Sequence, residues 1–197
     1  MADPIVVVDY DPSWRERFQL LQQRIAEALG SMAAAIEHVG STAVPNLAAK
    51  PIIDIDVLLA AEAELSAAID RLAALGYVHR GDLGIPGREA FRAPVHDAPH
   101  HLYVCPAGSK AFQEHLAFRD YLRAHSKEAE AYADLKRALA LKFRDDRPAY
   151  NSAKSAFVAE ILSRAMTAPL GEPDISLHPH RPKLAQPPRA NAIFPLT

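Results

Sequence analysis

The sequence predicts an α+β fold: a mixed β-sheet flanked by helices, followed by a C-terminal helical segment. Two observations predict it, because the extended apolar segments come first and three helical segments follow one another later in the chain. A doubly wound fold would instead alternate strands and helices regularly. With 197 residues, the chain is long enough for one domain with a sizeable core and too short for two.

The N-terminal part supplies a helix and the first strands. Asp11-Pro12 opens a helix whose apolar side chains recur every three or four residues, and Gly30 closes it. These side chains are Trp14, Phe18, Leu21, Ile25 and Ala28. Residues 36–39 and 51–59 are predicted strands, and the second is apolar on both sides of two aspartates, as in a central strand.

The next elements complete the predicted domain. A helix is expected from about residue 62 to 75, where Gly76 ends it. Residues 89–95 and 100–104 indicate two antiparallel strands joined by a short turn. Three further helices are expected at about 110–124, 127–144 and 150–165.

The last 31 residues differ in composition from the rest, since they hold seven of the sixteen prolines and no helical or alternating pattern. We therefore predict a domain at 1–166 and a Pro-rich C-terminal tail at 167–197, either flexible or lying along the domain or a neighbouring subunit.

Composition and charge exclude several classes of protein. The formal net charge is -2 and the charge is mixed along the chain, so we expect no DNA binding. No apolar run approaches the roughly 20 residues of a membrane helix, and we expect no membrane partner. One cysteine and an N-terminus without a signal pattern predict a cytoplasmic protein. The oligomeric state is not predictable.

The strongest candidates for functional residues lie between His38 and Asp56. Gly40 and the hydroxyls of Ser41 and Thr42 follow a predicted strand, in a turn that can approach a phosphate and donate to its oxygens. Asp54 and Asp56 lie in the next strand and point to the same face, about 7 Å apart. Mg²⁺ between these carboxylates and a triphosphate would relieve their repulsion. The alternative is an ordinary turn with solvated aspartates.

A Gly-Ser turn before a strand with Asp-x-Asp resembles the nucleotidyltransferase signature, in which the acids hold a divalent metal. The whole segment 38–55 resembles the hallmark of the GrpB family, which is placed among nucleotidyltransferase-like proteins. Further segments resemble the same family, so that the resemblance covers roughly residues 5–165: 10–14, 84–88, 100–102 and 115–122. It implies a nucleotidyltransferase-like sheet. The family also occurs fused to dephospho-CoA kinase, which implies an accessory role as an alternative.

The chain departs from active nucleotidyltransferases at the later strand that usually carries a third carboxylate, because segment 101–104 contains no acid. His101 and Tyr103 share a face of this strand. The expected metal site is therefore Asp54, Asp56 and His101, with Tyr103 as a hydrogen-bonding wall. The two carboxylates suit Mg²⁺, whereas imidazole is a poorer partner for Mg²⁺ than carboxylate and suits Mn²⁺ or Zn²⁺, and the metal is expected to be Mg²⁺ or Mn²⁺.

Several cations are candidates for binding phosphate. Lys50 precedes the acidic strand, and Arg88 and Arg92 fall on one side of an extended segment. The alternative for all three is a solvated surface cation. His38 is expected either to orient Ser41 or reach a ligand, or to be a hydrogen-bonded structural histidine.

Two later cations complete the candidates. Arg119 lies in an apolar helix and is expected either to reach the cleft or to form a salt bridge with Asp120 or Glu114. Tyr150 and Lys154 match the Tyr-x-x-x-Lys of short-chain dehydrogenases, but the glycine-rich dinucleotide turn is absent. Lys154 is therefore a candidate for a phosphate site.

The sequence thus favours a metal-dependent nucleotidyltransferase that acts on a small molecule or a protein. Gly40, Ser41 and Thr42 would hold the triphosphate, Asp54 and Asp56 the metal, and Arg88 and Arg92 the acceptor or the polyphosphate tail. Asp56 is also a candidate for deprotonating the nucleophile. The alternative is a non-catalytic module that binds a nucleotide or another anionic metabolite in the same cleft.

Overall fold

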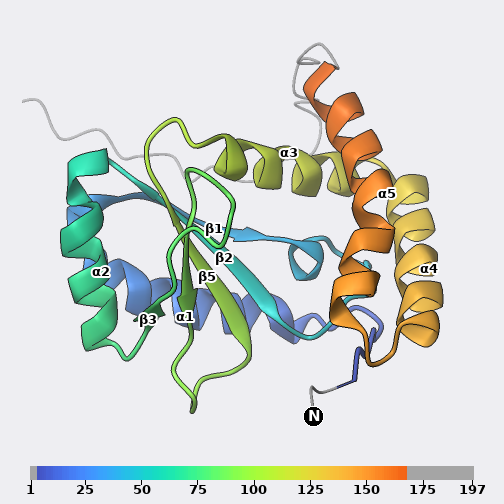
Figure 1. Ribbon diagram of the computed structural model, residues 1–197, viewed down its shortest axis with the longest axis horizontal. Coiled ribbons are helices and arrows are strands. Elements are labelled where there is room, and N and C mark those ends of the chain that lie inside the picture. Colours follow the sequence, from blue (N-terminus) through green and yellow to red (C-terminus); the bar gives the residue numbers. More distant parts are fainter. Residues whose placement is uncertain (1–3, 168–197) are drawn as a thin grey trace, which may run out of the picture. The chain divides into compact units, whose positions relative to one another are not determined.

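Five strands form one mixed sheet in the order β1-β2-β5-β4-β3 (Figure 1). They are β1 (Ala33–Val39), β2 (Ile53–Leu59), β3 (Val78–His79), β4 (Glu89–Arg92) and β5 (His100–Cys105). Only β2 and β5 run parallel, and every other neighbouring pair is antiparallel. The structure is a computed structural model and describes residues 4–167. The predicted α+β class is confirmed, and β2 is central as its apolar pattern indicates.

Within residues 4–167 there are five α-helices: α1 (Ser13–Leu29), α2 (Leu65–Ala74), α3 (Lys110–Ala124), α4 (Ser126–Lys142) and α5 (Arg147–Thr167). The predicted helices are all present, with ends shifted by a few residues. A 3-10 turn at Glu62–Glu64 replaces the start of the predicted second helix. Strand β3 was missed in the sequence, because two residues are too few to show an alternating pattern. No helix within residues 4–167 has the length and apolar character needed to cross a membrane.

One face of the sheet packs against α1 and α2. Trp14, Phe18 and Ile25 of α1 are buried in a core that includes the odd-numbered residues of β2. Burial of each large apolar side chain contributes about 1.5–3 kcal/mol. Because side chains alternate along a strand, this packing leaves Asp54 and Asp56 on the opposite face.

The opposite face lies towards α3, which contacts α4 and α5 (Figure 1). A second apolar cluster joins the connection between β1 and β2 to these helices, through Val44 and Leu47 against Leu122, Tyr132 and Ile161. The helices therefore form a wall beside the aspartates. Of the predicted tail at 167–197, Thr167 is the last residue of α5, and the rest lies outside the described residues.

Candidate functional site

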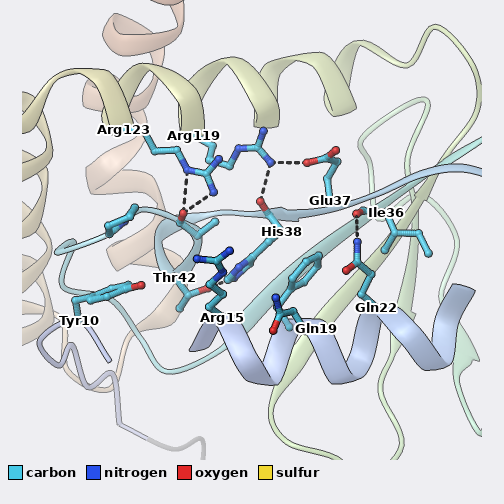
Figure 2. Close-up of a pocket in the computed structure, with 13 residues that line it drawn as sticks. Tyr10, Arg15, Gln19, Gln22, Ile36, Glu37, His38, Thr42, Arg119 and Arg123 are labelled. Carbon is cyan, nitrogen blue, oxygen red and sulfur yellow. Dashed lines mark hydrogen bonds and ion pairs between the residues drawn. The ribbon is translucent and has the colours of Figure 1, made fainter. Parts of the chain in front are cut away.

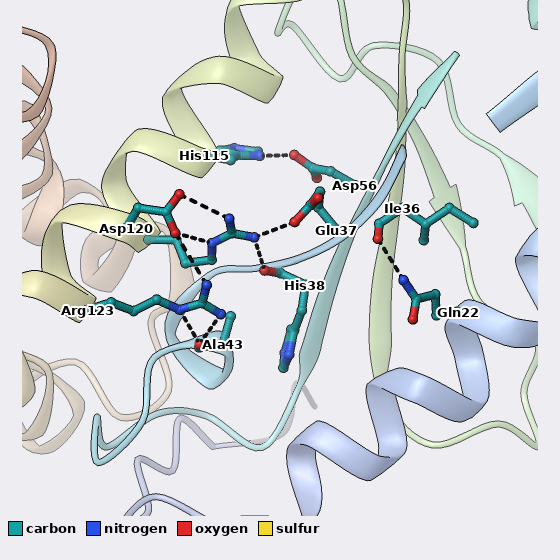
Figure 3. A network of polar contacts seen from close by, with 10 residues as sticks. Gln22, Ile36, Glu37, His38, Ala43, Asp56, His115, Asp120 and Arg123 are labelled. Carbon is teal, nitrogen blue, oxygen red and sulfur yellow. Dashed lines mark hydrogen bonds and ion pairs between the residues drawn. The ribbon is translucent and has the colours of Figure 1, made fainter. Parts of the chain in front are cut away.

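The two aspartates of β2 each accept a hydrogen bond from a histidine. His101 Nδ1 on β5 donates to Asp54 Oδ1 at 2.8 Å. His115 Nδ1 on α3 donates to Asp56 Oδ2 at 2.7 Å, as Figure 3 shows. The Asp54 side chain is 30% exposed, whereas that of Asp56 is fully buried. Asp54 is thus the carboxylate that is open to solvent, whereas Asp56 is buried and contacts His115.

The buried pair of Asp56 and His115 is electrostatically coupled. Burial raises the pKa of Asp56 above its usual value. Burial works against a charge on His115, but the hydrogen bond and the charge of Asp56 outweigh it and raise the pKa of the imidazole. The second oxygen of Asp56, Oδ1, is buried and has no hydrogen-bond partner among the described residues. A buried carboxylate oxygen of this kind favours an additional donor or a cation.

The predicted metal trio of Asp54, Asp56 and His101 is not preassembled. Within residues 4–167, no group of three or more His, Cys, Asp or Glu side chains is arranged to hold a metal ion. The physical reason is that His101 turns Nδ1 towards Asp54 and orients this carboxylate instead. Two carboxylates with one free buried oxygen still fit a hard divalent cation, whose other ligands would be phosphate oxygens and water.

The turn after β1 brings the backbone directly against Asp54. Gly40 has φ +69° and ψ -169°, a region that is essentially restricted to glycine. A Cβ atom at this position would lie 2.3 Å from Asp54 Oδ2. Glycine is therefore required for this close approach. The sequence indicates a turn that can approach a phosphate, and in the structure the same backbone lies against the Asp54 carboxylate.

Thr42 and His38 hold this turn in place. His38 Nε2 is 2.9 Å from Thr42 Oγ1, and the Thr42 hydroxyl donates to the carbonyl of Ile52. Burial lowers the pKa of His38 to about 4, and its ring stacks on Phe18. His38 is thus the structural, hydrogen-bonded histidine of the two alternatives, and it orients Thr42 rather than Ser41.

A cavity of about 270 Å³ lies between Asp54 and residues of α4 and α5. Its cations are Lys50, Lys136, Arg147 and Lys154, and Asp54 is its one acidic residue. Lys50 and Lys154 place their ammonium groups 5.5 and 5.2 Å from the ring centre of Tyr150. Ser41, Thr42, Ala49, Ile52, His101, Tyr103 and Asn151 complete the lining.

The cations of this basic cavity are held close together and partly out of water. Burial, followed by the charges of Lys154 and Arg147, lowers the pKa of Lys50. Burial also lowers the pKa of Lys154. Lys136 is 3% exposed, and burial lowers its pKa to about 7 while its amine donates to the carbonyl of Ala48. An anion bound here would relieve the mutual repulsion of these groups.

A second cavity, of about 170 Å³, adjoins the first and shares Asp54 and Tyr103 with it. The Arg88 guanidinium lies 4.0 Å from the ring centre of Tyr103, and His115 forms another part of the wall. Arg88 is 9% exposed, and its Nε is buried without a hydrogen-bond partner among the described residues. Asp54 thus stands at the boundary between a basic cavity and a smaller one.

Most of the predicted site residues lie at one of these two cavities. Those that line the basic cavity are Ser41, Thr42, Lys50, Asp54, His101, Tyr103 and Lys154, and those that line the smaller one include Gly40 and Arg88. Arg92 pairs with His101 in the sheet and so shares its face, as its spacing from Arg88 indicates. Arg92 is nevertheless exposed and lines neither cavity.

Arg119 also lies away from both cavities. It forms the predicted salt bridge with Asp120 and, in addition, pairs with Glu37 at 2.7 Å and donates to the carbonyl of His38 (Figure 3). Glu37 is 82 residues away in the chain, so its involvement could not be inferred from helical spacing. Arg119 therefore fastens α3 to β1.

Four polar or charged residues of the two cavities were not predicted: His115, Lys136, Arg147 and Asn151. Lys136 had a recognisable signal, because it interrupts the apolar stripe of Tyr132, Ala133 and Ala140 that buries one side of α4. His115 had a weaker one, since it lies one helical turn before Arg119. Arg147 had none, because it begins α5 and only the packing of that helix brings it to the cavity.

Two solved structures resemble this fold. A crystal structure of the conserved protein GrpB from Enterococcus faecalis has a TM-score of 0.75 at 34% identity and covers 82% of this chain and 97% of its own. A structure of the Cid1 poly(U) polymerase has a TM-score of 0.54 at 12% identity and covers 74% of this chain and 50% of its own. The second likeness concerns the fold alone, which is nucleotidyltransferase-like.

Proteins related in sequence indicate the same family as the Enterococcus faecalis structure. A UPF0157 protein of Streptomyces coelicolor is 41% identical over 160 residues, which are 81% of this chain and 83% of the relative. The UPF0157 protein YqkA of Bacillus subtilis is 36% identical over 78% of this chain, but the chain spans only 45% of YqkA. A dephospho-CoA kinase of Mycolicibacterium paratuberculosis is 26% identical over 82% of this chain and 46% of the kinase. Residues 4–164 match the family model described as GrpB protein, and the chain therefore belongs to the GrpB family.

Proposed function

We propose that this chain is a metal-dependent nucleotidyltransferase that moves a nucleotidyl group from an NTP to a small molecule or a protein. The observation that carries the proposal is the position of Asp54, at the boundary between a cavity with four cations and a smaller cavity. A transferase needs this arrangement, because the donor and the acceptor must meet at the metal-binding acid. The structurally similar Cid1 polymerase is described as bound to MgATP, which supports the same donor chemistry.

The basic cavity is the proposed site of the triphosphate. Lys50, from the connection between β1 and β2, converges with Arg147 and Lys154 of α5 on one cavity that has Ser41 at its wall. Burial lowers the pKa values of Lys50 and Lys154, and the neighbouring charges of Lys154 and Arg147 lower that of Lys50 further, so a multiply charged anion would stabilise these ammonium groups. Lys136 lies behind them and keeps the Ala48 carbonyl of the turn in place.

Asp54 and Asp56 are the proposed metal ligands, with the free Oδ1 of Asp56 as one contact. A divalent cation held there would neutralise charge on the phosphates as the bond between the α-phosphorus and the bridging oxygen breaks. Mg²⁺ or Mn²⁺ suits the carboxylates, and His101 would add a ligand only through its second ring nitrogen, which favours Mn²⁺. In the absence of that contact, His101 orients Asp54.

The smaller cavity is the proposed site of the acceptor. The acceptor oxygen or nitrogen would form a bond to the α-phosphorus, and the bond to the bridging oxygen would break to release pyrophosphate. Nε2 of His115 is the atom placed to receive the acceptor proton, because Nδ1 is held by Asp56. Arg88, stacked on Tyr103, offers its unpaired Nε to an anionic group of the acceptor.

A second candidate function is non-catalytic binding of a nucleotide or another anionic metabolite. One observation favours it: each aspartate already accepts a hydrogen bond from a histidine, and no third carboxylate joins them on β5. The full-length YqkA and dephospho-CoA kinase relatives extend well beyond the matched segment, which is compatible with an accessory module.

Calorimetric titration of NTPs with and without Mg²⁺ or Mn²⁺, combined with a pyrophosphate-release assay, separates the two functions. A transferase binds NTP in a metal-dependent way, and Asp54→Asn abolishes this dependence. Lys154→Gln weakens NTP binding in either case. Lys142→Gln is the matched control, because Lys142 is exposed on α4 beside Phe143 and lines neither cavity.

The outcomes are distinct. Metal-dependent binding with pyrophosphate release on addition of acceptors supports the transferase. Metal-independent binding without release, unchanged in Asp54→Asn, supports the binding module and refutes the transferase. If neither Lys154→Gln nor Asp54→Asn alters any NTP binding, both functions are assigned to the wrong cavity.

A further inference from the structure

A third and larger cavity, of about 430 Å³, lies at the edge of the sheet, between α1, β1 and α3 (Figure 2). It shares a single residue, Thr42, with the basic cavity. Most of its lining is polar or charged, and Arg15, Arg119 and Arg123 are its cations. The volume falls within the range of small-molecule sites.

The edge of β1 exposes backbone groups to this cavity. The carbonyl of Ile36 accepts from Gln22 Nε2 at 3.0 Å, and the carbonyl of His38 accepts from Arg119 Nη1 at 2.9 Å (Figure 3). In an antiparallel pair, a residue whose carbonyl points away from the partner strand also points its N–H group away. The amides of Ile36 and His38 therefore face outward as hydrogen-bond donors, while the carbonyls beside them are already satisfied.

Two of the three arginines are fixed in place by the protein itself. Arg119 pairs with Glu37 and Asp120, and Arg123 donates to the carbonyl of Ala43 at 2.7 Å. The charges of Glu37 and Asp120 balance those of the two arginines, and most of the arginine donors are engaged in these contacts. Arg15 differs, because its guanidinium pairs with no carboxylate within residues 4–167.

Arg15 is an exposed residue of α1 that borders the cavity and points towards His38 and Thr42, opposite the two fixed arginines (Figure 2). Gln19 follows it by one helical turn, and the Tyr10 hydroxyl lies at the same end of the cavity. Among the described residues, neither the Gln19 amide nor the Tyr10 hydroxyl makes a side-chain hydrogen bond. Within the described part of the chain, the unoccupied groups are thus the guanidinium of Arg15, which is the one unpaired cation of the lining, and neutral donors.

We propose that this cavity binds a compact polar anion that carries a carboxylate or a phosphate group, separately from the nucleotide site. Arg15 makes the charged contact, because a guanidinium binds either group in a bidentate way. Gln19, Tyr10 and the outward amides of β1 bind the rest of the molecule. Glu37 offers an acceptor for a hydroxyl or amino group of the ligand, since only its Oε2 is engaged by Arg119.

The test is a ¹H–¹⁵N NMR titration of the full chain with two probes, inorganic phosphate and succinate. A Lys154→Gln background is used so that phosphate binding in the basic cavity does not obscure the result. The expected result is a saturable shift of the Ile36, His38 and Thr42 amides. Arg15→Gln is expected to weaken this binding about tenfold or more, because it removes the charged contact.

Arg17→Gln is the matched control, because Arg17 lies on the same helix but faces Asp11 at 3.6 Å and does not line the cavity. Gln19→Glu is a second variant and weakens anion binding through repulsion, without removal of an arginine. The probe that binds more tightly identifies the ligand group as phosphate or carboxylate. The proposal is overturned if neither probe shifts these amides, or if Arg15→Gln binds as tightly as Arg17→Gln.

Discussion

Replacement of Gly40 by alanine should disturb both the fold and the candidate site. The backbone at Gly40 has φ +69° and ψ -169°, and the new Cβ would lie 2.3 Å from Asp54 Oδ2. A contact this short cannot be kept, so the Asp54 carboxylate must turn away. The hydrogen bond that Asp54 accepts from His101 at 2.8 Å is then lost.

The expected loss of unfolding free energy has two parts. A residue other than glycine in this backbone region costs about 1–3 kcal/mol. Loss of the partly exposed Asp54–His101 hydrogen bond costs about 0.5–1.5 kcal/mol more. Gly40→Ala should therefore destabilise the chain by about 2–4 kcal/mol in a urea titration followed by circular dichroism.

Gly30→Ala is the matched control for the backbone part. Gly30 also has positive φ, +55° with ψ -132°, but a Cβ there meets nothing within 4 Å. The excess destabilisation of Gly40→Ala over Gly30→Ala then measures the contact with Asp54. In an Asp54→Ala background, where the nearest remaining atom is Cβ at 3.1 Å, this excess should shrink. The reasoning is refuted if Gly40→Ala costs no more than Gly30→Ala, or costs the same with and without Asp54.

Three further predictions concern the charged groups. Burial lowers the pKa of Lys136 from 10.5 to about 7 on folding, so between these values the unfolded chain binds more protons and stability rises with pH; urea titrations across pH 6–10 should show a steeper rise in wild type than in Lys136→Met, which keeps only the contributions of Lys50 and Lys154. Arg119→Gln should cost about 2 kcal/mol, because it leaves the His38 carbonyl and Glu37 without their donor, whereas Arg137→Gln at an exposed ion pair should leave the urea midpoint unchanged. Lys154→Gln should weaken NTP binding about tenfold in calorimetry while the melting temperature without ligand stays close to that of wild type; unchanged affinity would contradict the assignment of the basic cavity.

Local patterns in the sequence predict most of the helices and strands. The three- and four-residue spacing from Trp14 to Ile25 specifies α1, and the apolar flanks of Asp54 and Asp56 specify a central strand. These predictions hold because they depend on one element and the face that it buries. Strand β3 is too short to give such a signal, and its two residues are extended only because they pair with β4.

The candidate site was likewise predictable only in part from the sequence. The alternation of side chains along a strand places Asp54, Asp56, His101 and Tyr103 on one face, since β2 and β5 are neighbours in the sheet. The partners of the charged residues could not be predicted, because they come from elements far apart in the chain. Arg119 was a candidate for the cleft, but Glu37 on β1 holds it elsewhere.

By itself, the sequence determined the helices and the strands other than β3, the glycine turn and the position of the two aspartates on β2, because these depend on backbone conformation and on hydrophobic periodicity. Only the tertiary structure decided that each aspartate is held by a histidine, that Lys136 and Arg147 join Lys50 and Lys154 in one cavity, and that a separate cavity opens at the edge of β1. The physical reason is that the charges of a site are set by long-range packing of α3, α4 and α5 against the sheet, whereas each helix or strand forms from its own local pattern.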